Sequence, residues 1–438
     1  MTNLQIKRIS ERIVFLPFMK VIHLNTYDGN GGAGRACYRL NTALQNAGLE
    51  SEMYTFMKFS QKPNIHALYP NLVQRALATT NILAERYLPK FYTKNLKLPF
   101  SLSLFGMDIH QHPAVKAADI IHLHWVNHGF LNPAALEKLA LLNKPIVWTI
   151  HDSNTFTGGC HVRFNCQNYK DSCGFCPLLK TPAEHDISNQ IWQKKQKAYQ
   201  KIKPQIISPS TWLAEAARQS GLLKNASINV IPNTLETQIF KPTNKLAAKK
   251  ALNIQENQFV LLSGFMPSKK DAHKGTAYLV NALDLWITKN PDLKDKATLL
   301  IFGNRQTETS LPFKIPVRFL GTINDDEKLA LAYAAADVFL TTSLEDNLPN
   351  TVMESLACGT PVVSFTTGGI PDMVIHQKNG YLAEYKNTED FTRGIHWVYQ
   401  HPEKEKLNTN ARKTVMNKFS EEIIAQQHLK LYQHILSK

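Results

Sequence analysis

The sequence predicts an α/β fold of two doubly wound, Rossmann-like domains that face each other across a cleft. Short apolar runs alternate with segments of helical spacing, the alternation starts again after Pro242, and 438 residues suffice for two domains of roughly 200 residues each. Strand–helix–strand alternation implies right-handed crossovers and mostly parallel sheets. An apolar content of 43% and a charged content of 19% are ordinary for globular proteins, which excludes the disordered and fibrous classes.

The first half begins with a buried strand over Met19–Tyr27, a glycine loop over Asp28–Gly34 and a helix over Arg35–Gly48. A second helix is expected over Pro133–Asn143, between two of the later strands. Those further strands are predicted at Ser51–Met57, Ile120–Trp125, Pro145–Ile150, Ile206–Ser208 and Ile228–Ile231.

The second half repeats the alternation. Strands are predicted at Phe259–Gly264, Ala297–Gly303, Val317–Leu320, Val338–Thr341 and Pro361–Ser364. Helices are predicted at Thr276–Lys289, Asp325–Ala335, Thr351–Cys358 and Ser420–Leu436. We therefore expect an N-terminal domain over 19–235, a C-terminal domain over 236–418, and a final helix within 419–438 that crosses back to the first domain.

The positive charge is concentrated in the first half. The formal net charge is +15; residues 1–235 carry 26 basic and 13 acidic groups, whereas residues 236–438 carry 24 and 22. Such a field attracts phosphates, anionic lipid headgroups or nucleic acid, although a solubilising surface is the simpler explanation. Leu72–Leu88 combines an apolar helical stripe with nearby basic residues, Arg75, Arg86, Lys90, Lys94 and Lys97. This stripe either packs on its own domain or contacts a membrane surface.

Apolar runs of the ~18–20 residues needed to span a bilayer do not occur, which argues against an integral membrane protein. The opening segment has only a six-residue apolar stretch, Ile13–Phe18, which is too short for a secretory signal. We expect a cytoplasmic protein. Peripheral contact with the inner face of the membrane is compatible with that location.

Two loops of the first half carry groups suited to ligand binding. Glycines at Asp28–Arg35 let the backbone approach a ligand and offer N–H groups to an anion, although the spacing is not GxGxxG and a tight turn is the alternative. His151 and Asp152 follow a strand, where histidine serves acid–base or orienting roles, or simply a structural hydrogen bond. His122 and His124 share one face of their strand, and packing is expected of at least one.

Four of the six cysteines fall within 17 residues, at Cys160, Cys166, Cys173 and Cys176. The spacing from Cys173 to Cys176 is typical of structural zinc, and four thiolates suit tetrahedral Zn²⁺ in a reducing compartment. Disulfides and free thiols are the alternatives. Catalytic zinc is disfavoured because four thiolates leave no open position on the metal.

Two segments of the second half offer complementary charges. Lys269, Lys270 and Lys274 precede Gly275 and a predicted helix, an arrangement that suits a diphosphate unless the lysines are merely solvated. Asp346 and Glu354 are eight residues apart, one in a loop and one in the following helix. Two such acceptors facing a cleft suit the vicinal hydroxyls of sugars, whereas a metal would need more ligands nearby.

These segments together resemble the retaining glycosyltransferases of family 4, which have the two-domain GT-B fold. The resemblance covers nearly the whole chain from Met19, and the cysteine-bearing TGGC…CGFCP segment resembles a subgroup that builds bacterial surface polysaccharides. It rests on Gly31–Gly34, His151-Asp152, Pro209-Ser210, Pro232-Asn233, Lys274-Gly275, Ser343–Val362, Gly368–Asp372 and Asn379-Gly380.

The resemblance implies roles for individual residues. Asp346 and Glu354 match the two acids that hold the donor hexose and the nucleotide ribose, Lys274 and Gly32 match groups at the donor diphosphate, and His151 matches a histidine near the transferred sugar. Further donor-binding residues implied are Lys269, Lys270, Gly275, Glu345, Asn347, Leu348, Asn350 and Thr351, and acceptor-binding residues implied are Arg35, His124 and Asp152.

Three departures from the family pattern affect these roles. The first acid is Asp346 with Glu345 just before it, so either carboxylate could reach the sugar. Leu348-Pro349-Asn350 replaces the usual Phe-Gly-Leu, and proline lacks the backbone N–H available there. The arginine that usually precedes the lysine is absent, and Lys269 or Lys270 would substitute without bidentate geometry.

The sequence therefore predicts a metal-independent, retaining hexosyltransferase with no catalytic cofactor and one structural zinc. Its expected donor is a UDP- or GDP-linked sugar, its acceptor a glycan or a polyprenyl-diphosphate-linked saccharide, and its setting surface polysaccharide biosynthesis. A sugar-nucleotide epimerase or phosphorylase of the same fold is one alternative. A basic nucleic-acid-binding protein is another, although no recognised nucleic-acid motif is present and no nucleic-acid partner is expected.

Overall fold

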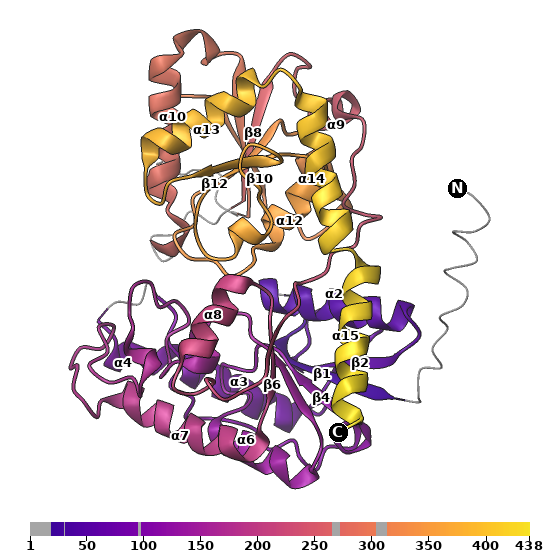
Figure 1. Cartoon of the computed structure of the whole chain (residues 1–438), viewed down its shortest axis with the longest axis vertical. Helices are drawn as coiled ribbons and strands as arrows, with labels where there is room; N and C mark the ends of the chain where they lie inside the picture. The colour runs from indigo at the N-terminus through magenta and orange to yellow at the C-terminus, as the bar shows by residue number, and fades with distance from the viewer. Residues whose placement is uncertain (1–18, 30, 95–97, 265–271, 304–312) are drawn as a thin grey trace.

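The computed structural model of the chain describes residues 19–29, 31–94, 98–264, 272–303 and 313–438. Two α/β domains lie one above the other, the N-terminal domain below and the C-terminal domain above in Figure 1. Each is built on a parallel sheet whose central strands are buried on both faces, which explains why most strands read as short continuous apolar runs.

The N-terminal sheet has seven parallel strands in the order β3-β2-β1-β4-β5-β6-β7. The order reverses beside β1, which pairs with both β2 and β4, so a crevice opens at the carboxyl ends of these strands. The strands are β1 Lys20–Tyr27, β2 Glu50–Met57, β3 Ile65–Ala67, β4 Ile120–Leu123, β5 Ile146–Thr149, β6 Gln205–Ser208 and β7 Ile228–Val230.

Helices cover this sheet on both faces and leave two separate cores. Ile22 and Leu24 of β1 enter one core, and the preceding residue, Val21, points to the opposite face and enters the other core together with the C-terminal helix. The helices are α2 Gly32–Asn46, α3 Leu72–Tyr87, α4 Pro89–Tyr92, α5 Pro113–Ala117, α6 Pro133–Leu139, α7 Ile187–Ile202 and α8 Thr211–Gln219.

The C-terminal sheet has six parallel strands in the order β10-β9-β8-β11-β12-β13. They are β8 Phe259–Gly264, β9 Ala297–Phe302, β10 Val317–Gly321, β11 Val338–Thr341, β12 Val362–Phe365 and β13 Gly380–Ala383. The helices are α9 Lys245–Ala251, α10 Thr276–Lys289, α11 Asp326–Ala335, α12 Asn350–Ala357, α13 Thr388–Gln400 and α14 Lys404–Lys418.

The last helix, α15 (Glu421–Leu436), lies along the N-terminal domain, as Figure 1 shows. Its Ile424, Leu429 and Tyr432 are buried in a core shared with Val21 of β1 and with α2. The chain thus passes between the domains twice. The two passages lie side by side, because Leu235 pairs with Ser420 and the Thr234 hydroxyl donates to the Phe419 carbonyl at 3.2 Å.

The expected strands and helices are present, with differences at their ends. The glycine loop is shorter than predicted, because α2 begins at Gly32 rather than Arg35. Gly31 has φ of +90°, a conformation open to glycine, and it turns the chain directly into the helix. The helix predicted over Pro133–Asn143 ends at Leu139 and continues as a 3₁₀ turn, Ala140–Leu142.

Candidate active site

A cleft with a volume of ≈ 470 Å³ lies between the carboxyl ends of the two sheets. Loops after β1, β4 and β5 form its lower wall, and loops after β8 and β11 form its upper wall, as expected for ligand sites in open α/β sheets. The lining side chains and backbone come from Asn25, Tyr27, Gly31–Gly34, Pro99, Trp125, His128, His151–Ser153, His161-Val162, Trp212, His273-Lys274 and Glu345–Asn347.

Lys274 and Asp346 form an ion pair on the upper wall, with Lys274 Nζ 2.7 Å from Asp346 Oδ2. Lys274 immediately precedes Gly275, which caps α10 with φ of +64°. A Cβ on Gly275 would come within 2.1 Å of the Thr342 carbonyl oxygen, so only glycine lets this helix start so close to the loop after β11. A cation, a carboxylate and a helix N-terminus therefore meet at the cleft, where they can bind a phosphate and a hydroxyl.

Glu345 is engaged differently from its neighbour Asp346. Its two carboxylate oxygens accept backbone N–H bonds from Arg163 (3.0 Å) and Phe164 (2.7 Å) in the other domain. Burial raises the pKa of Glu345, and these N–H bonds and the charge of Arg163 act against that increase. The structure therefore pairs Asp346, not Glu345, with the lysine of the cleft.

Two asparagines of the same segment hold the domains together. Asn347 Nδ2 lies 3.3 Å from the Ile150 carbonyl oxygen and 3.2 Å from that of His151, and the Ser210 hydroxyl donates to Asn347 Oδ1 at 2.6 Å. Asn350 Nδ2 donates to the Gly32 carbonyl at 3.2 Å, which brings the glycine loop against the start of α12. These contacts set the width of the cleft.

Glu354 lies beside the cleft, buried between arginines of the N-terminal domain. Its Oε1 is 2.9 Å from Arg39 Nη1 and 3.5 Å from Arg35 Nη1, and the Tyr333 hydroxyl donates to its Oε2 at 3.1 Å. Arg39 is equally buried and also lies 2.5 Å from Glu236, although its N–H groups are not aligned on these oxygens. The predicted ribose-binding acid thus meets two arginines that the sequence had not paired with it.

The remaining predicted donor residues occupy different environments. The Leu348 side chain is buried in the core of the C-terminal domain and does not line the cleft. Thr351 is half-buried in the first turn of α12. Lys269 and Lys270 lie outside the described residues. The roles assigned to these residues stay predictions.

The predicted acceptor residues are also separated from one another. Arg35 contacts Asp326 at 3.2 Å in addition to Glu354, so it points to the other domain. His124 lies behind His151, with its Nδ1 3.1 Å from His151 Nε2. His151 lines the cleft, and burial lowers its pKa to about 4, which leaves it neutral near pH 7.

Asp152 lines the cleft and fixes the rings around it. It accepts from Trp125 Nε1 at 2.8 Å, from the Asn154 backbone N–H at 2.8 Å, and contacts His161 Nδ1 at 2.6 Å. Burial alone would raise the pKa of Asp152, but His161 and these bonds outweigh it and hold the pKa below its usual range. Trp125, His128, His161 and Trp212 line the same wall, and no motif in the sequence marks them.

The four clustered cysteines are not joined by disulfides and surround one cavity with a volume of ≈ 20 Å³. Burial raises the pKa of Cys173 to about 12, and it raises the pKa values of Cys160 and Cys176 as well. Their shared cavity and donor chemistry fit a structural zinc. Within the described part of the chain, however, the ligand atoms close enough for one ion are those of His23, His122 and His124, so the thiols stand farther apart than zinc requires.

Two family models match the two domains. Residues 30–239 match Glycosyltransferase Family 4, and residues 258–401 match Glycosyl transferases group 1. Among curated relatives, N-acetyl-alpha-D-glucosaminyl L-malate synthase of Bacillus anthracis is 25% identical over 95% of this chain and 97% of its own length. The putative colanic acid biosynthesis glycosyl transferase WcaC of Escherichia coli is 23% identical over 83% of this chain and 86% of its own.

A shorter match is with N,N'-diacetylbacillosaminyl-diphospho-undecaprenol alpha-1,3-N-acetylgalactosaminyltransferase of Campylobacter jejuni, 28% identical over 51% of this chain and 58% of its own. Among solved structures, sucrose-phosphate synthase of Thermosynechococcus elongatus has a TM-score of 0.63 and 18% identity, covering 95% of this chain and 99% of its own. Anabaena Alr3699/HepE in complex with UDP-glucose has a TM-score of 0.62 and 17% identity, covering 95% and 100%. These structures share the two-domain GT-B fold with this chain.

Proposed function

We propose that this chain, a glycosyltransferase of the GT4 and GT-B type, moves a hexose from a nucleotide sugar to a saccharide acceptor with retention of configuration, in surface polysaccharide biosynthesis. The observation that carries the proposal is the pairing of Lys274 with Asp346 at the N-terminus of α10, inside the interdomain cleft. This arrangement offers a cation and helix N–H groups to a diphosphate, and a carboxylate to a sugar hydroxyl.

The positions of the cleft carboxylates support a mechanism without a protein nucleophile. Glu345 is held by N–H groups of the opposite domain, Asp346 by Lys274, and Asp152 by Trp125 and His161. We propose that the acceptor attacks from the face of the leaving group, and that an oxygen of the leaving phosphate takes the acceptor's proton. Lys274 and the start of α10 would stabilise the charge that develops on this phosphate, without a catalytic metal or other cofactor.

The comparisons support a choice of donor and acceptor. HepE was solved with UDP-glucose, and the name of the Campylobacter relative specifies a diphospho-undecaprenol-linked acceptor. We propose a UDP- or GDP-linked hexose as donor, and a glycan or a polyprenyl-diphosphate-linked saccharide as acceptor.

Incubation with a panel of UDP- and GDP-sugars, reading release of nucleoside diphosphate, tests the function. We expect release with one donor class, retained anomeric configuration by NMR once an acceptor is found, and a large loss in Lys274→Met. Lys314→Met, an exposed lysine of the same domain, is the matched control and should behave as the unmodified protein. Interconversion of sugar nucleotides without transfer would instead identify an epimerase, and binding of none of the panel would refute the proposal.

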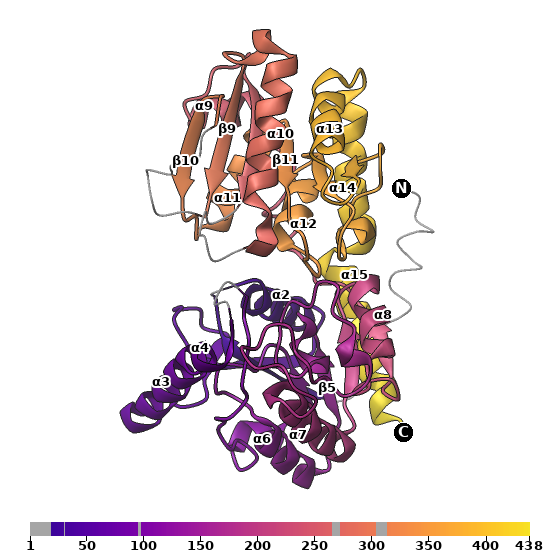
Figure 2. The same cartoon turned by 90° about the vertical axis from the view of Figure 1, so that its left-hand side faces the viewer.

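An exposed apolar ridge on the N-terminal domain supports contact with a membrane. The ridge consists of Leu72, Val73, Leu77, Leu83, Tyr87 and Phe91 on α3 and α4, which project from the domain in Figure 2. Leu72, Val73 and Phe91 are 81%, 72% and 73% exposed. The alternative that this stripe packs on its own domain is therefore wrong for these residues.

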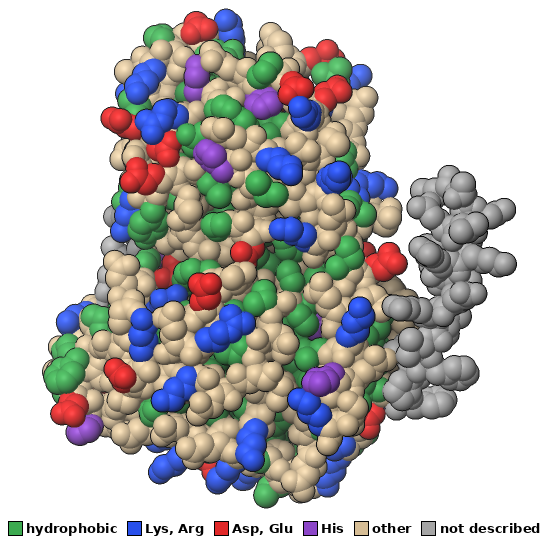
Figure 3. Space-filling model, in the orientation of Figure 1, with side chains coloured by type: hydrophobic (Ala, Val, Ile, Leu, Met, Phe, Trp, Pro, Cys, Tyr) green, Lys and Arg blue, Asp and Glu red, His purple; other side chains and the backbone are tan. Residues whose placement is uncertain are grey.

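The ridge is firmly attached despite its exposure. Glu85 of α3 is buried, and its carboxylate accepts four backbone N–H bonds, from Leu102, Ser103, Leu104 and Phe105. Arg75, Arg86, Lys90 and Lys94 are exposed on or beside the ridge, and Figure 3 shows lysines and arginines spread over this domain. Lys97 lies outside the residues that the structure describes. Among the described residues, no helix has both the length and the apolarity to cross a bilayer. We therefore propose peripheral binding to anionic lipid, which would bring the cleft to a lipid-linked acceptor.

Co-sedimentation with lipid vesicles tests this binding. Retention should require anionic vesicles and should fall as salt rises, since each basic group near the surface contributes about 1 kcal/mol and is screened. The triple variant Arg75→Glu, Arg86→Glu and Lys90→Glu should lose retention but keep donor hydrolysis. Equal retention on neutral and anionic vesicles, or none on either at low salt, would refute the membrane proposal.

We also propose one structural zinc per chain, held by Cys160, Cys166, Cys173 and Cys176. Their donor chemistry and common cavity support it, and binding would draw the thiols closer together than they stand in this structure. Metal analysis of the purified protein should give about one zinc per chain. Absence of zinc, together with four titratable thiols in the folded protein, would refute it.

A further inference from the structure

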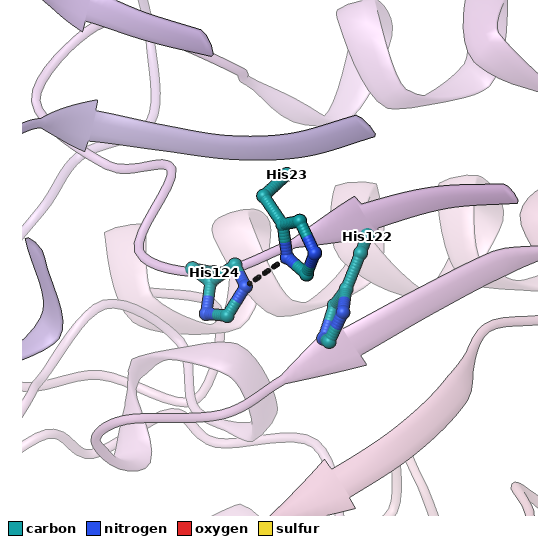
Figure 4. Close-up of side chains that lie close together, drawn as sticks. All are labelled: His23, His122 and His124. Carbon is teal, nitrogen blue, oxygen red and sulfur yellow. Dashed lines mark hydrogen bonds between the residues drawn. The ribbon is translucent and has the colours of Figure 1, made fainter. Parts of the chain in front are cut away.

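Two buried histidines lie in a row behind the cleft histidine. His23 Nδ1 is 3.0 Å from His124 Nε2, and His124 Nδ1 is 3.1 Å from His151 Nε2. His23 comes from β1, and the other two follow β4 and β5, so neighbouring strands bring the three rings together. Figure 4 shows the contact between His23 and His124. We call His23, His124 and His151 the histidine chain.

All three rings of the histidine chain are neutral near pH 7. Burial lowers the pKa of His23 to about 3 and that of His151 to about 4, and it holds the pKa of His124 well below its usual range. A neutral imidazole has one N–H and one bare nitrogen. Every ring in the row must therefore donate its hydrogen in the same direction. The hydrogen bonds run either from His151 through His124 to His23, or from His23 through His124 to His151.

The far end of the histidine chain favours one arrangement. On α15, His428 Nδ1 lies 2.9 Å from the Ile424 carbonyl oxygen, which only accepts, so Nδ1 carries the hydrogen and Nε2 is bare. Within the described structure, Nε2 of His428 and Nε2 of His23 are both buried without a hydrogen-bond partner, and His428 is near enough to His23 to lower the pKa of the His23 ring further. If Nε2 of His23 were also bare, its lone pair would be repelled by the lone pair on Nε2 of His428. An N–H at Nε2 of His23 is instead attracted to that lone pair.

We propose that His428, His23 and His124 are positioning residues that hold His151 with a protonated Nε2 and a bare Nδ1. His151 Nε2 then donates to His124 Nδ1, and His124 Nε2 donates to His23 Nδ1. Because Nε2 of His151 is committed to His124, Nδ1 is the nitrogen available to the cleft. The inference rests on the proposed function: in that reaction, His151 accepts a hydrogen bond from a hydroxyl of the bound sugar and offers it no donor.

The neighbouring ring of His122 argues against a metal in this layer. His122 groups with His23 and His124 at distances that a metal could join. Both nitrogens of His122 are already paired, however, Nδ1 with the Tyr432 hydroxyl and Nε2 with the Thr149 hydroxyl, each at 2.7 Å. The group also contains no carboxylate to balance a buried dication. His122 is therefore outside the histidine chain and serves as its control.

Nitrogen NMR of protein labelled with ¹⁵N-histidine tests the tautomer directly, with His151 assigned by its disappearance in His151→Gln. We expect a protonated Nε2 and an unprotonated Nδ1 in His151. A protonated Nδ1 would overturn the inference, and so would a stoichiometric transition metal bound by these histidines. This measurement needs no substrate, so it stands even if the protein transfers no sugar, an outcome that would refute only the proposed function.

Kinetics of three variants then tests the positioning role. His124→Leu should lower kcat roughly tenfold, the effect of one lost hydrogen bond, with little change in KM for the donor. His124→Gln should restore much of this loss, because an amide both donates and accepts. His122→Gln should keep both kcat and the His151 tautomer. Unchanged kcat in folded His124→Leu, or an equal loss in His122→Gln, would overturn the inference.

Discussion

The two walls of the cleft differ in how they treat charge. The upper wall, from the C-terminal domain, presents the ion pair of Lys274 and Asp346 in the cleft. Beside the cleft, its Glu354 pairs with Arg39 of the N-terminal domain. The lower wall presents mainly rings that burial keeps neutral, among them His151 and His128, whose pKa values are lowered to about 4. Its carboxylate Asp152 is already occupied by Trp125 and His161.

This difference indicates a division of labour within one site. The proposed donor carries its charge on a nucleoside diphosphate, which suits the wall with a cation and a helix N-terminus. A hexose and a saccharide acceptor are rich in uncharged hydroxyls, and they suit neutral hydrogen-bonding rings. Each wall can therefore be perturbed separately, and the perturbations should have different signatures.

Glu354→Gln should have the largest effect, because it breaks the buried ion pair between the walls. Arg39 and Glu354 are each only 1% exposed, and removing one partner of such a pair typically costs 3–5 kcal/mol. We expect a loss near 3 kcal/mol in the free energy of unfolding, since Glu236 still faces Arg39, together with loss of most activity. Urea denaturation and donor-binding calorimetry measure the two effects.

Asp326→Asn is the matched control for Glu354→Gln. Asp326 contacts the same two arginines but is 22% exposed and lies 4.0 Å from Arg39, so its loss should cost much less. If Glu354→Gln changed the stability by less than 1 kcal/mol, the ion pair would not join the walls in solution. If nucleotide affinity were also unchanged, Glu354 would not bind the ribose.

Asp346→Asn should affect catalysis more than stability. Loss of a charged hydrogen-bond acceptor for the sugar should remove about 1.5–3 kcal/mol of transition-state stabilisation, which lowers kcat/KM roughly 10–150-fold. Glu345→Gln is the adjacent control and should mainly weaken the contact with Arg163 and Phe164. A larger catalytic loss in Glu345→Gln than in Asp346→Asn would reverse the assignment of the two acids.

Acid should destabilise the protein through buried histidines of the lower wall and of α15. His151, His128 and His428 have folded pKa values of about 4, below the value of 6.5 for an exposed histidine. Between these pH values the unfolded chain binds more protons, so the free energy of unfolding falls as the pH is lowered. We expect about 1–2 kcal/mol per histidine between pH 6.5 and 5.

Urea denaturation at a series of pH values measures this slope. His151→Gln removes one titrating ring and should give a shallower dependence on pH than the unmodified protein. A stability that stays constant from pH 6.5 to 5 would show that these rings are not kept neutral by the fold.

The sequence predicts the sheets and the charged wall better than the neutral wall. Apolar runs mark most strands, because strands buried on both faces need apolar side chains at every position. The short outer strands β3 and β13 lack such a run, and so they were not predicted. The Lys274 and Asp346 segments are recognisable because each lies within a single strand–loop–helix unit, where the spacing between its residues is fixed.

Contacts between distant segments leave no such local signal. Arg39 looks like one more surface residue of an amphipathic helix until Glu354, more than 300 positions later, is placed against it. His428 likewise comes near the end of the histidine chain only because α15 returns to the first domain. The choice between Glu345 and Asp346 depends on backbone N–H groups of Arg163 and Phe164, which sequence spacing does not reveal.

We expect the paired passages at Leu235 and Ser420 to act as the hinge of any movement between the domains, because both covalent connections lie at one place. Two segments held side by side should let the upper domain rotate about them and should oppose translation of one domain along the other. Opening would break the contacts of Glu345, Asn347 and Asn350 across the cleft, and reclosing would restore them in the same register. Substrate exchange and exact realignment of the two walls can therefore alternate over many turnovers, because the axis of motion is built into the covalent path.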